Sequence, residues 1–152
     1  MELRIVFSDG GGEEKFRKLE EKTRILGPAF RDAGVYMKEE IMINFSEEGR
    51  PRKWKPLSAK YLEYKMQKKG SSKILEFTGR LKNSINTQYS NDKAKVFTGV
   101  KYGVKHQMGL GVPARPFFPD SQNPDIPPFD NKGKENISSI FIKHLKSGGV
   151  GV

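Results

Sequence analysis

The stretch SINTQYSNDKAKVFTGV, from Ser84 to Val100, decides the fold class of this chain. In its second half, Lys93 to Val100, every second residue from Ala94 onward is small or β-branched, which is the pattern of a half-buried strand. The first half, Ser84 to Tyr89, is a partner strand, because Asn91-Asp92 between the two is a turn signal. The stretch therefore predicts an antiparallel hairpin.

The chain opens with another alternating segment, Met1 to Phe7, in which Leu3, Ile5 and Phe7 fall on one face. The sequence Ser8-Asp9-Gly10-Gly11-Gly12 follows, and we expect it to end this strand. We expect this N-terminal strand to join the hairpin, because one sheet then accounts for both alternating segments.

A long helical region is predicted from Glu13 to Phe45, where apolar residues recur at spacings of three and four on both sides of Pro28. These residues are Phe16, Leu19, Thr23 and Leu26 before the proline and Phe30, Ala33, Met37, Ile41 and Phe45 after it. Because proline lacks a backbone donor, we predict a kink or a short break at Pro28. A C-terminal helix is predicted from Glu135 to Leu145 by the same spacing.

Shorter elements lie between these two helical regions. Ser58 is a favourable N-cap for a short helix, and Gln67 to Lys73 is predicted to be a polar, mobile connection. Tyr102 to Met108 has the length of one or two helical turns. Residues 109–134 contain six prolines and are predicted to form a long loop.

The sequence thus predicts an α+β fold. An antiparallel sheet of the N-terminal strand and the hairpin is packed by a long kinked helical region and a C-terminal helix. Residues 1–146 form a single domain, and the glycine-rich residues 147–152 form a flexible tail.

Composition restricts the chemistry and the partners. The chain has 152 residues, no cysteine and a net charge of +10, and no apolar run approaches the roughly 20 residues of a membrane span. We expect a soluble, unexported protein without a membrane partner. The charge is uneven, because residues 50–82 hold eleven lysines and arginines against two glutamates, a local charge of +9.

Catalytic patterns are weak. His106 and His144 lie on separate predicted elements, and neither has a nearby partner at metal-ligand spacing. Gly10-Gly11-Gly12 lacks the lysine and hydroxyl residue of a phosphate-binding loop. We therefore predict no enzyme activity, no catalytic residues, no metal and no cofactor.

The basic segment has two interpretations. Its cations are either a patch for DNA or an acidic partner, or a solvated and flexible rim. The patch residues are Arg50, Arg52, Lys53, Lys55, Lys68 and Lys69. Trp54, Tyr61 and Tyr64 are interleaved with these cations, as stacking on bases requires, but aromatic residues near prolines more often pack a turn onto a core.

Several short pieces, read in order, resemble one known family. The pieces are Asn44-Phe45 to Glu48-Gly49-Arg50-Pro51, Trp54-Lys55-Pro56-Leu57-Ser58, Ile74-Leu75, Thr78-Gly79-Arg80-Leu81-Lys82-Asn83-Ser84-Ile85, Gly99-Val100-Lys101-Tyr102-Gly103, His106-Gln107-Met108-Gly109 and Pro113-Ala114-Arg115-Pro116-Phe117-Phe118. Their order and spacing resemble the phage virion morphogenesis family, the Mu-like and P2-like tail-completion proteins. Arg52-Lys53 and Gly103 depart from it, because the family often has glycine before the tryptophan and alanine after the tyrosine.

The resemblance implies a structural protein of a phage or prophage that completes the tail or prepares the head-tail junction. It also implies a ring-like homo-oligomer, with phage tail and head-tail connector proteins as partners and passing DNA as a further contact. Assembly would take place in the host bacterial cytoplasm, with retention in the virion as an additional possibility. A basic DNA-binding or regulatory module is the alternative function.

Most motif residues are expected to have structural roles. Trp54 and Pro56 would hold the long loop on the core, and Thr78-Gly79 would shape a sharp turn into the sheet. Tyr102, His106 and Gln107 would share one face of a short helix and hydrogen-bond the turn that begins at Gly109.

The loop from Gly109 to Phe118 is the predicted interaction site. Phe117 and Phe118 would form apolar tips that a proline-stiffened loop presents to a partner. Arg115 would be either an interface anchor or a clamp on a carboxylate. The alternative is that the two phenylalanines fold onto their own core.

Overall fold

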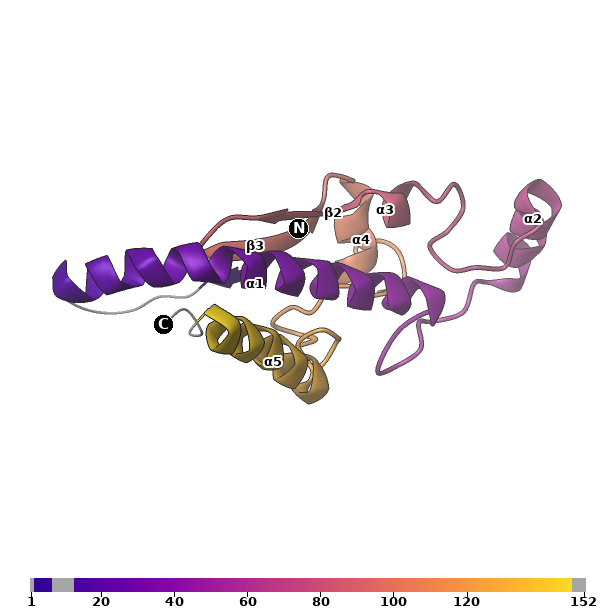
Figure 1. The fold of residues 1–152 in the computed structure, drawn as a ribbon. Coiled ribbons are helices and arrows are strands. Elements are labelled where there is room, and N and C mark those ends of the chain that lie inside the picture. Colours follow the sequence, from indigo (N-terminus) through magenta and orange to yellow (C-terminus); the bar gives the residue numbers. More distant parts are fainter. Residues whose placement is uncertain (1, 7–12, 149–152) are drawn as a thin grey trace.

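The computed structural model describes residues 2–6 and 13–148 (Figure 1). Three strands and five helices occur in these ranges. In chain order they are β1 (Glu2–Val6), α1 (Glu13–Ser46), α2 (Ala59–Lys69), α3 (Arg80–Asn83), β2 (Ile85–Tyr89), β3 (Lys93–Thr98), α4 (Tyr102–Met108) and α5 (Asn131–Gly148). The mixture of helices with an antiparallel sheet confirms the predicted α+β class.

The sheet has the order β1-β3-β2, and both pairings are antiparallel. The hairpin aligns Ile85 with Thr98, and β1 aligns Leu3 with Val96. Along β3, Ala94, Val96 and Thr98 are buried while their neighbours are not, which is the predicted alternation. The predicted sheet is therefore confirmed, although Phe7 and Gly10–Gly12 lie outside the described residues.

Helix α1 runs without interruption through Pro28, so of the predicted kink or short break the break is wrong. The same face of the helix is fully buried from Ala29 to Phe45. Its core residues are Ala29, Phe30, Ala33, Met37, Ile41 and Phe45. Burial of one large apolar side chain contributes about 1.5–3 kcal/mol, so several of them outweigh the cost of about 3 kcal/mol for one internal proline.

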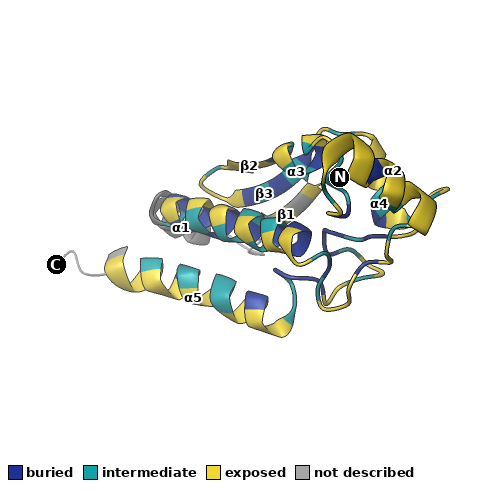
Figure 2. Cartoon of the chain, turned by 90° about the vertical axis from the view of Figure 1, so that its right-hand side faces the viewer, coloured by how far each residue is buried: buried dark blue, intermediate teal, exposed yellow. Residues whose placement is uncertain are grey.

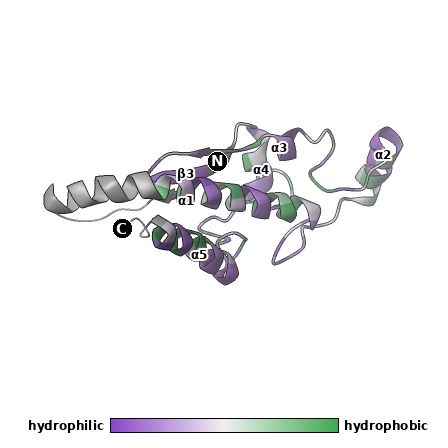
Figure 3. Cartoon of the chain, viewed as in Figure 1, coloured by the Kyte–Doolittle hydropathy of each residue, from purple (hydrophilic) through white to green (hydrophobic). Residues whose placement is uncertain are grey.

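The fold has three layers, with α1 between the sheet and α5 (Figure 1). On the sheet side, Gly34 allows a close approach, because a Cβ atom there would lie 2.7 Å from Cγ2 of Thr87. On the other side the rings of Phe30 and Phe141 meet edge to face at 4.9 Å. Figure 3 shows hydrophobic and hydrophilic bands along α5 and along the coloured part of α1, as expected for amphipathic helices.

Helix α5 begins four residues before its predicted start and extends to Gly148. Asp130 explains the earlier start, because its Oδ1 accepts a hydrogen bond from the backbone N–H of Gly133 at 3.1 Å. The first two residues of the predicted tail, Ser147 and Gly148, are therefore helical, and 149–152 lie outside the described residues.

Helix α2 stands away from the three layers (Figure 1) and is exposed over most of its surface (Figure 2). Ser58 caps its start, as predicted, by accepting from the backbone N–H of Tyr61. Gly70, in the left-handed conformation, caps its end. The predicted mobile connection is thus wrong for residues 67–69, because this cap and the lysines of the last turn favour helix up to Lys69.

Within the described part of the chain, no helix combines the length and apolar character needed to cross a membrane.

Candidate interaction site

Gln107 on α4 organises the long loop that follows it. Its side chain is 2% exposed, and Oε1 accepts hydrogen bonds from the backbone N–H groups of Phe117 (2.9 Å) and Phe118 (3.1 Å). Its Nε2 donates to the carbonyl oxygen of Phe118 (2.7 Å) and to Oδ2 of Asp120 (2.5 Å). The prediction that Gln107 hydrogen-bonds the turn beginning at Gly109 is therefore wrong, because Gln107 binds backbone and side-chain groups farther along the loop.

Gly109 ends α4 in the left-handed conformation, with φ of 73°. A Cβ atom at this position would meet Cβ of Ala114 at 3.0 Å, so the tight return of the loop also favours glycine. Gly103 is similarly close to its neighbours, because a Cβ atom would lie 3.0 Å from Cδ1 of Leu81. The departure from the family pattern at this position thus coincides with tight packing against α3.

Trp54 connects the same loop to the segment before α2. The indole is 5% exposed, and its Nε1 donates to the carbonyl oxygen of Pro116 at 2.8 Å. Its ring meets the ring of Phe45 on α1 edge to face at a centroid distance of 5.6 Å. Trp54 therefore lies where a residue that holds the long loop on the core is expected, and Pro56 lies two residues farther on, at the rim of a cavity.

Arg115 makes a second link between these segments. It is 6% exposed, its Nε donates to the carbonyl oxygen of Lys55 at 2.9 Å, and a terminal nitrogen donates to that of Pro56 at 3.2 Å. Burial lowers the pKa of the guanidinium, which stays charged at any ordinary pH. Of its two expected roles, the structure supports a clamp, although on backbone carbonyls of its own chain rather than on a carboxylate.

Phe117 and Phe118 are not the apolar tips of an exposed loop. Both are fully buried, and the Phe117 ring packs against Phe45 at 5.1 Å. The expectation of an outward-facing pair is corrected, because Gln107 satisfies their backbone groups and so allows this part of the loop to enter the core.

Asn44 is a buried polar residue whose role sequence reasoning missed. It is fully buried on α1, and its Nδ2 donates to the carbonyl oxygens of Phe117 and Pro127, both at 3.1 Å. Its Oδ1 accepts from Nε of Arg50 at 2.8 Å. The available signal was a single amide between the core positions Ile41 and Phe45, in a helix whose buried face is otherwise apolar.

Arg50 belongs to this internal network rather than to an open basic patch. Its terminal nitrogen donates to the carbonyl oxygen of Glu40 at 2.6 Å and pairs with the Glu40 carboxylate at 2.8 Å. The prediction that Arg50 contributes to a DNA-contacting patch is corrected, because its guanidinium is half-buried and bound to its own chain.

Two other predicted patch residues are also paired. Lys53 contacts Glu47 at 3.1 Å, and Arg52 lies 3.9 Å from Asp125, both on the exposed surface. Lys69 lies over the ring of Phe77. Among the described residues, Lys55 and Lys68 have neither an ion pair nor a side-chain hydrogen bond. The basic segment is thus partly neutralised, and its contact with DNA stays a prediction.

A short helix that the sequence analysis missed follows Thr78 and Gly79. Gly79 has a φ of 72°, and Oγ1 of Thr78 accepts weakly from the backbone N–H of Arg80 at 3.4 Å. Helix α3 then leads directly into β2. These two residues therefore turn the chain toward the sheet through a helical turn.

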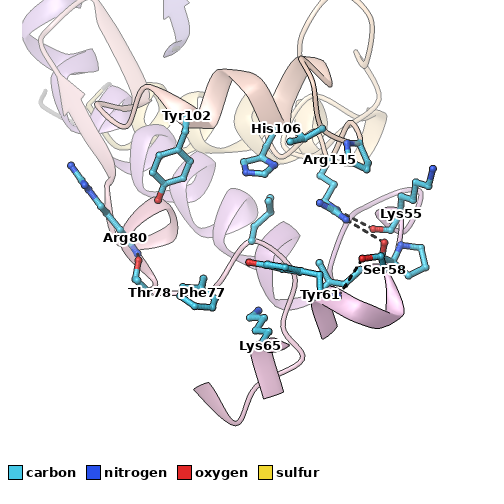
Figure 4. A pocket seen from close by; sticks show the side chains of 15 residues that line it. Lys55, Ser58, Tyr61, Lys65, Phe77, Thr78, Arg80, Tyr102, His106 and Arg115 are labelled. Atoms are coloured by element: carbon cyan, nitrogen blue, oxygen red, sulfur yellow. Dashed lines mark hydrogen bonds between the residues drawn. The ribbon is translucent and has the colours of Figure 1, made fainter. Parts of the chain in front are cut away.

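A cavity of about 910 Å³ lies between α2, α3, α4 and the loop after α4 (Figure 4), and we call it the α2–α4 pocket. Segments far apart in the sequence form its wall. The lining residues are Lys55, Pro56, Leu57, Ser58, Tyr61, Lys65, Leu75, Phe77, Thr78, Arg80, Tyr102, His106, Val112, Pro113 and Arg115. Motif pieces that the sequence analysis treated separately thus meet at one site.

Helix α4 contributes two ring side chains to this pocket. Tyr102 and His106 lie one turn apart and meet edge to face at 6.2 Å, while Gln107 is turned into the core. The three residues therefore do not share one face, which corrects that expectation. Burial, with a smaller contribution from the Arg115 charge, lowers the pKa of the His106 imidazole, so His106 is neutral at pH 7. In the described residues its buried Nδ1 has no hydrogen-bond partner.

The pocket is positively charged. Four of its lining residues are lysines or arginines, and none is an aspartate or a glutamate. Lys65 is almost fully buried, and its Nζ donates to the carbonyl oxygen of Lys73, while burial lowers its pKa. Chemically, such a wall suits a ligand that combines a negative charge with apolar surface.

Other chemistry has little support in the described residues. Within 2–6 and 13–148, no group of three or more His, Cys, Asp or Glu side chains is arranged to hold a metal ion. His144, the other histidine, contacts Asp32 at 2.8 Å and joins α5 to α1, far along the chain from His106.

Comparison with known proteins identifies a family. The model of the phage virion morphogenesis family matches residues 11–146. Neither the curated proteins nor the solved structures contain a significant match to this chain.

Proposed function

The chain belongs to the phage virion morphogenesis family and acts in virion assembly, and from this membership we propose that it completes the tail or joins head and tail. The match over residues 11–146 is the observation that carries the proposal, because it covers nearly all of the described fold. In this proposal the protein is a structural component that works by binding and without turnover.

The buried network around Gln107 supports a binding role. It fixes a loop of many residues without regular structure in one conformation, so the surface that surrounds the loop is preformed. A preformed surface loses little conformational entropy when it binds a partner. A protein that must recognise a completed tail end benefits from such a surface.

We also propose that the protein forms a ring-like homo-oligomer, as the axial symmetry of a tail end favours. Sedimentation velocity over a range of concentrations tests this proposal. A discrete species several times heavier than 17.2 kDa is expected to grow with concentration. A monomer at every concentration would show that the isolated protein does not form a ring.

The proposed step takes place in the host bacterial cytoplasm, where heads and tails meet. An extract that holds filled heads and free tails but lacks this protein provides the test. Addition of the purified protein is expected to restore infectious particles, and mass spectrometry of the purified virions would show whether it is retained. An unchanged titre would contradict a role in completing or joining.

A DNA-binding module is the second candidate, because Lys55 and Lys68 have neither an ion pair nor a side-chain hydrogen bond within residues 2–6 and 13–148. Phosphate contacts weaken steeply with salt, whereas an interface between subunits persists. Retention on duplex DNA at physiological salt, lost when both lysines are changed to glutamine, would favour this second candidate. Retention that disappears before physiological salt is reached favours the assembly role.

A further inference from the structure

We propose that the α2–α4 pocket binds an acidic peptide segment of a partner protein, with an aromatic or aliphatic residue of that segment buried in the cavity. This proposal goes beyond the role in tail completion, because it names the chemistry of a binding partner and is tested on the isolated chain.

Charge is the first argument. Arg80 and Lys55 line the pocket, and within the described residues neither side chain has an ion pair or a hydrogen bond. Figure 4 shows them at opposite sides of the cavity. Glu76 is an acidic neighbour in the sequence, but it pairs with Lys82 at 3.0 Å. In the part of the chain that the structure describes, these two cations therefore have no negatively charged partner and can pair with a negatively charged ligand at the rim of the pocket.

The apolar wall is the second argument. The rings of Tyr61, Phe77 and Tyr102 line the cavity together with the aliphatic side chains of Leu57 and Leu75. Tyr61 is 43% exposed and Tyr102 is 39% exposed, so both have surface that a ligand can cover. Large aromatic side chains with one polar end are frequent contact residues in protein interfaces. An anchor side chain between these rings would be removed from water.

Stability of the walls is the third argument. Arg115 binds the carbonyl oxygens of Lys55 and Pro56, and this fixes the segment that leads into α2. In the segment that follows α2, the backbone N–H of Ile74 donates to Oε1 of Glu48 at 2.8 Å. Both ends of the α2 segment are thus attached to the core, and the pocket exists before a ligand arrives.

The shape of the pocket favours a peptide over duplex DNA as its ligand. A duplex is read by protein elements that project into its grooves, whereas this site is a cavity of about 910 Å³ enclosed by several segments. A cavity of this volume is in the range that accommodates a drug-sized molecule or a few peptide side chains. Single-stranded nucleic acid, which stacks on aromatic rings, is the other class that such a wall can bind, and the experiment tests for it.

A displayed library of random short peptides, selected on the full-length chain, tests the proposal. The enriched peptides are expected to combine aspartate or glutamate with an aromatic or large aliphatic residue. Synthetic copies with a fluorescent label then give dissociation constants by anisotropy. Their affinity is expected to fall as salt increases, because the ion pairs at the rim are open to solvent.

Matched variants locate the binding site. Arg80→Glu reverses one unpaired cation of the pocket, and we expect the selected peptides to bind it at least about tenfold more weakly. Lys143→Glu makes the same change of charge on the exposed surface of α5, away from the pocket, and is expected to change affinity less than about twofold. Tyr102→Ala tests the apolar wall and is also expected to weaken binding. Unchanged melting temperatures show that each variant is folded.

Several results would overturn the proposal. One is the absence of enriched peptides, and another is an enriched set without acidic residues. Equal affinity losses for Arg80→Glu and Lys143→Glu would show that overall charge, not the pocket, attracts the peptides. A labelled oligothymidylate that binds through Arg80 and Tyr102, with no peptide enriched, would assign the pocket to single-stranded nucleic acid instead. None of these results depends on whether the protein completes tails.

Discussion

Replacement of Gln107 by leucine tests how strongly the long loop depends on one side chain. The change leaves three buried backbone groups without their partner, namely the N–H groups of Phe117 and Phe118 and the carbonyl of Phe118. Each unsatisfied buried group costs about 1–3 kcal/mol, and water that enters the loop recovers a part of this. We expect Gln107→Leu to lower the free energy of unfolding by about 3–6 kcal/mol.

Gln107→Glu refines the same prediction through its pH dependence. It keeps an acceptor for the N–H groups of Phe117 and Phe118 but places a second carboxylate against Oδ2 of Asp120, now 2.5 Å from Nε2. In the native protein burial opposes the charged form of Asp120, yet hydrogen bonds from Gln107 and Asn123 outweigh it and hold the pKa of Asp120 below its usual value.

The effect of these carboxylates on the pH dependence of stability therefore has opposite signs in the native protein and in Gln107→Glu. A lowered folded-state pKa means that Asp120 stabilises the native protein above a pH of about 4 and that this contribution is lost below it. In Gln107→Glu, two like charges raise the carboxyl pKa values of the folded state, so this variant should regain stability relative to the native protein as the pH falls from 7 to about 5.

Urea unfolding followed by far-UV circular dichroism measures both effects. Gln88→Leu is the matched control, because Gln88 is exposed on β2, and it should change the free energy of unfolding by less than about 0.5 kcal/mol. A cost below about 1 kcal/mol for Gln107→Leu would refute the reasoning, and so would a Gln107→Glu variant whose stability relative to the native protein falls from pH 7 to 5.

Further predictions concern other residues of the site. Trp54→Ala should lower the free energy of unfolding in urea by about 3–5 kcal/mol. Trp54→Phe loses mainly the hydrogen bond to Pro116 and should lower it by about 1–2 kcal/mol, and equal losses for the two variants would contradict the role of that bond. Burial lowers the pKa of His106, so the unfolded state binds its proton more readily and the free energy of unfolding of the wild type should fall between pH 7 and 5. The fall should be smaller for His106→Gln, and urea midpoints that change in parallel for the two proteins would contradict this. Trypsin should cut first between residues 68 and 73, where the lysines are exposed. Mass spectrometry of the first fragments tests this prediction, and first cleavage after the buried Lys65 would contradict it.

Regular elements were predictable because their burial follows one period along the chain. Ala94, Val96 and Thr98 alternate as a half-buried strand must, and the core face of α1 recurs at three and four residues. The predicted short break at Pro28 is wrong because the prediction considered the missing backbone donor of proline without the burial of the helix face from Ala29 to Phe45.

The candidate site was less predictable because it depends on contacts between distant segments. Phe117 and Phe118 follow prolines in a long loop, and nothing local shows that Gln107 and Asn44 draw their backbone groups into the core. The α2–α4 pocket is formed by pieces from both halves of the chain, so the short pieces identify the family but not the cavity between them.

Electron microscopy of lysates tests the central claim most directly. The sample is a phage or induced prophage whose copy of this gene is inactivated, and the control supplies the intact gene in trans. A protein that completes tails or joins them to heads predicts filled heads and free tails lying separately, with joined particles restored in the control. Complete, joined virions in the absence of the protein would contradict the proposed function.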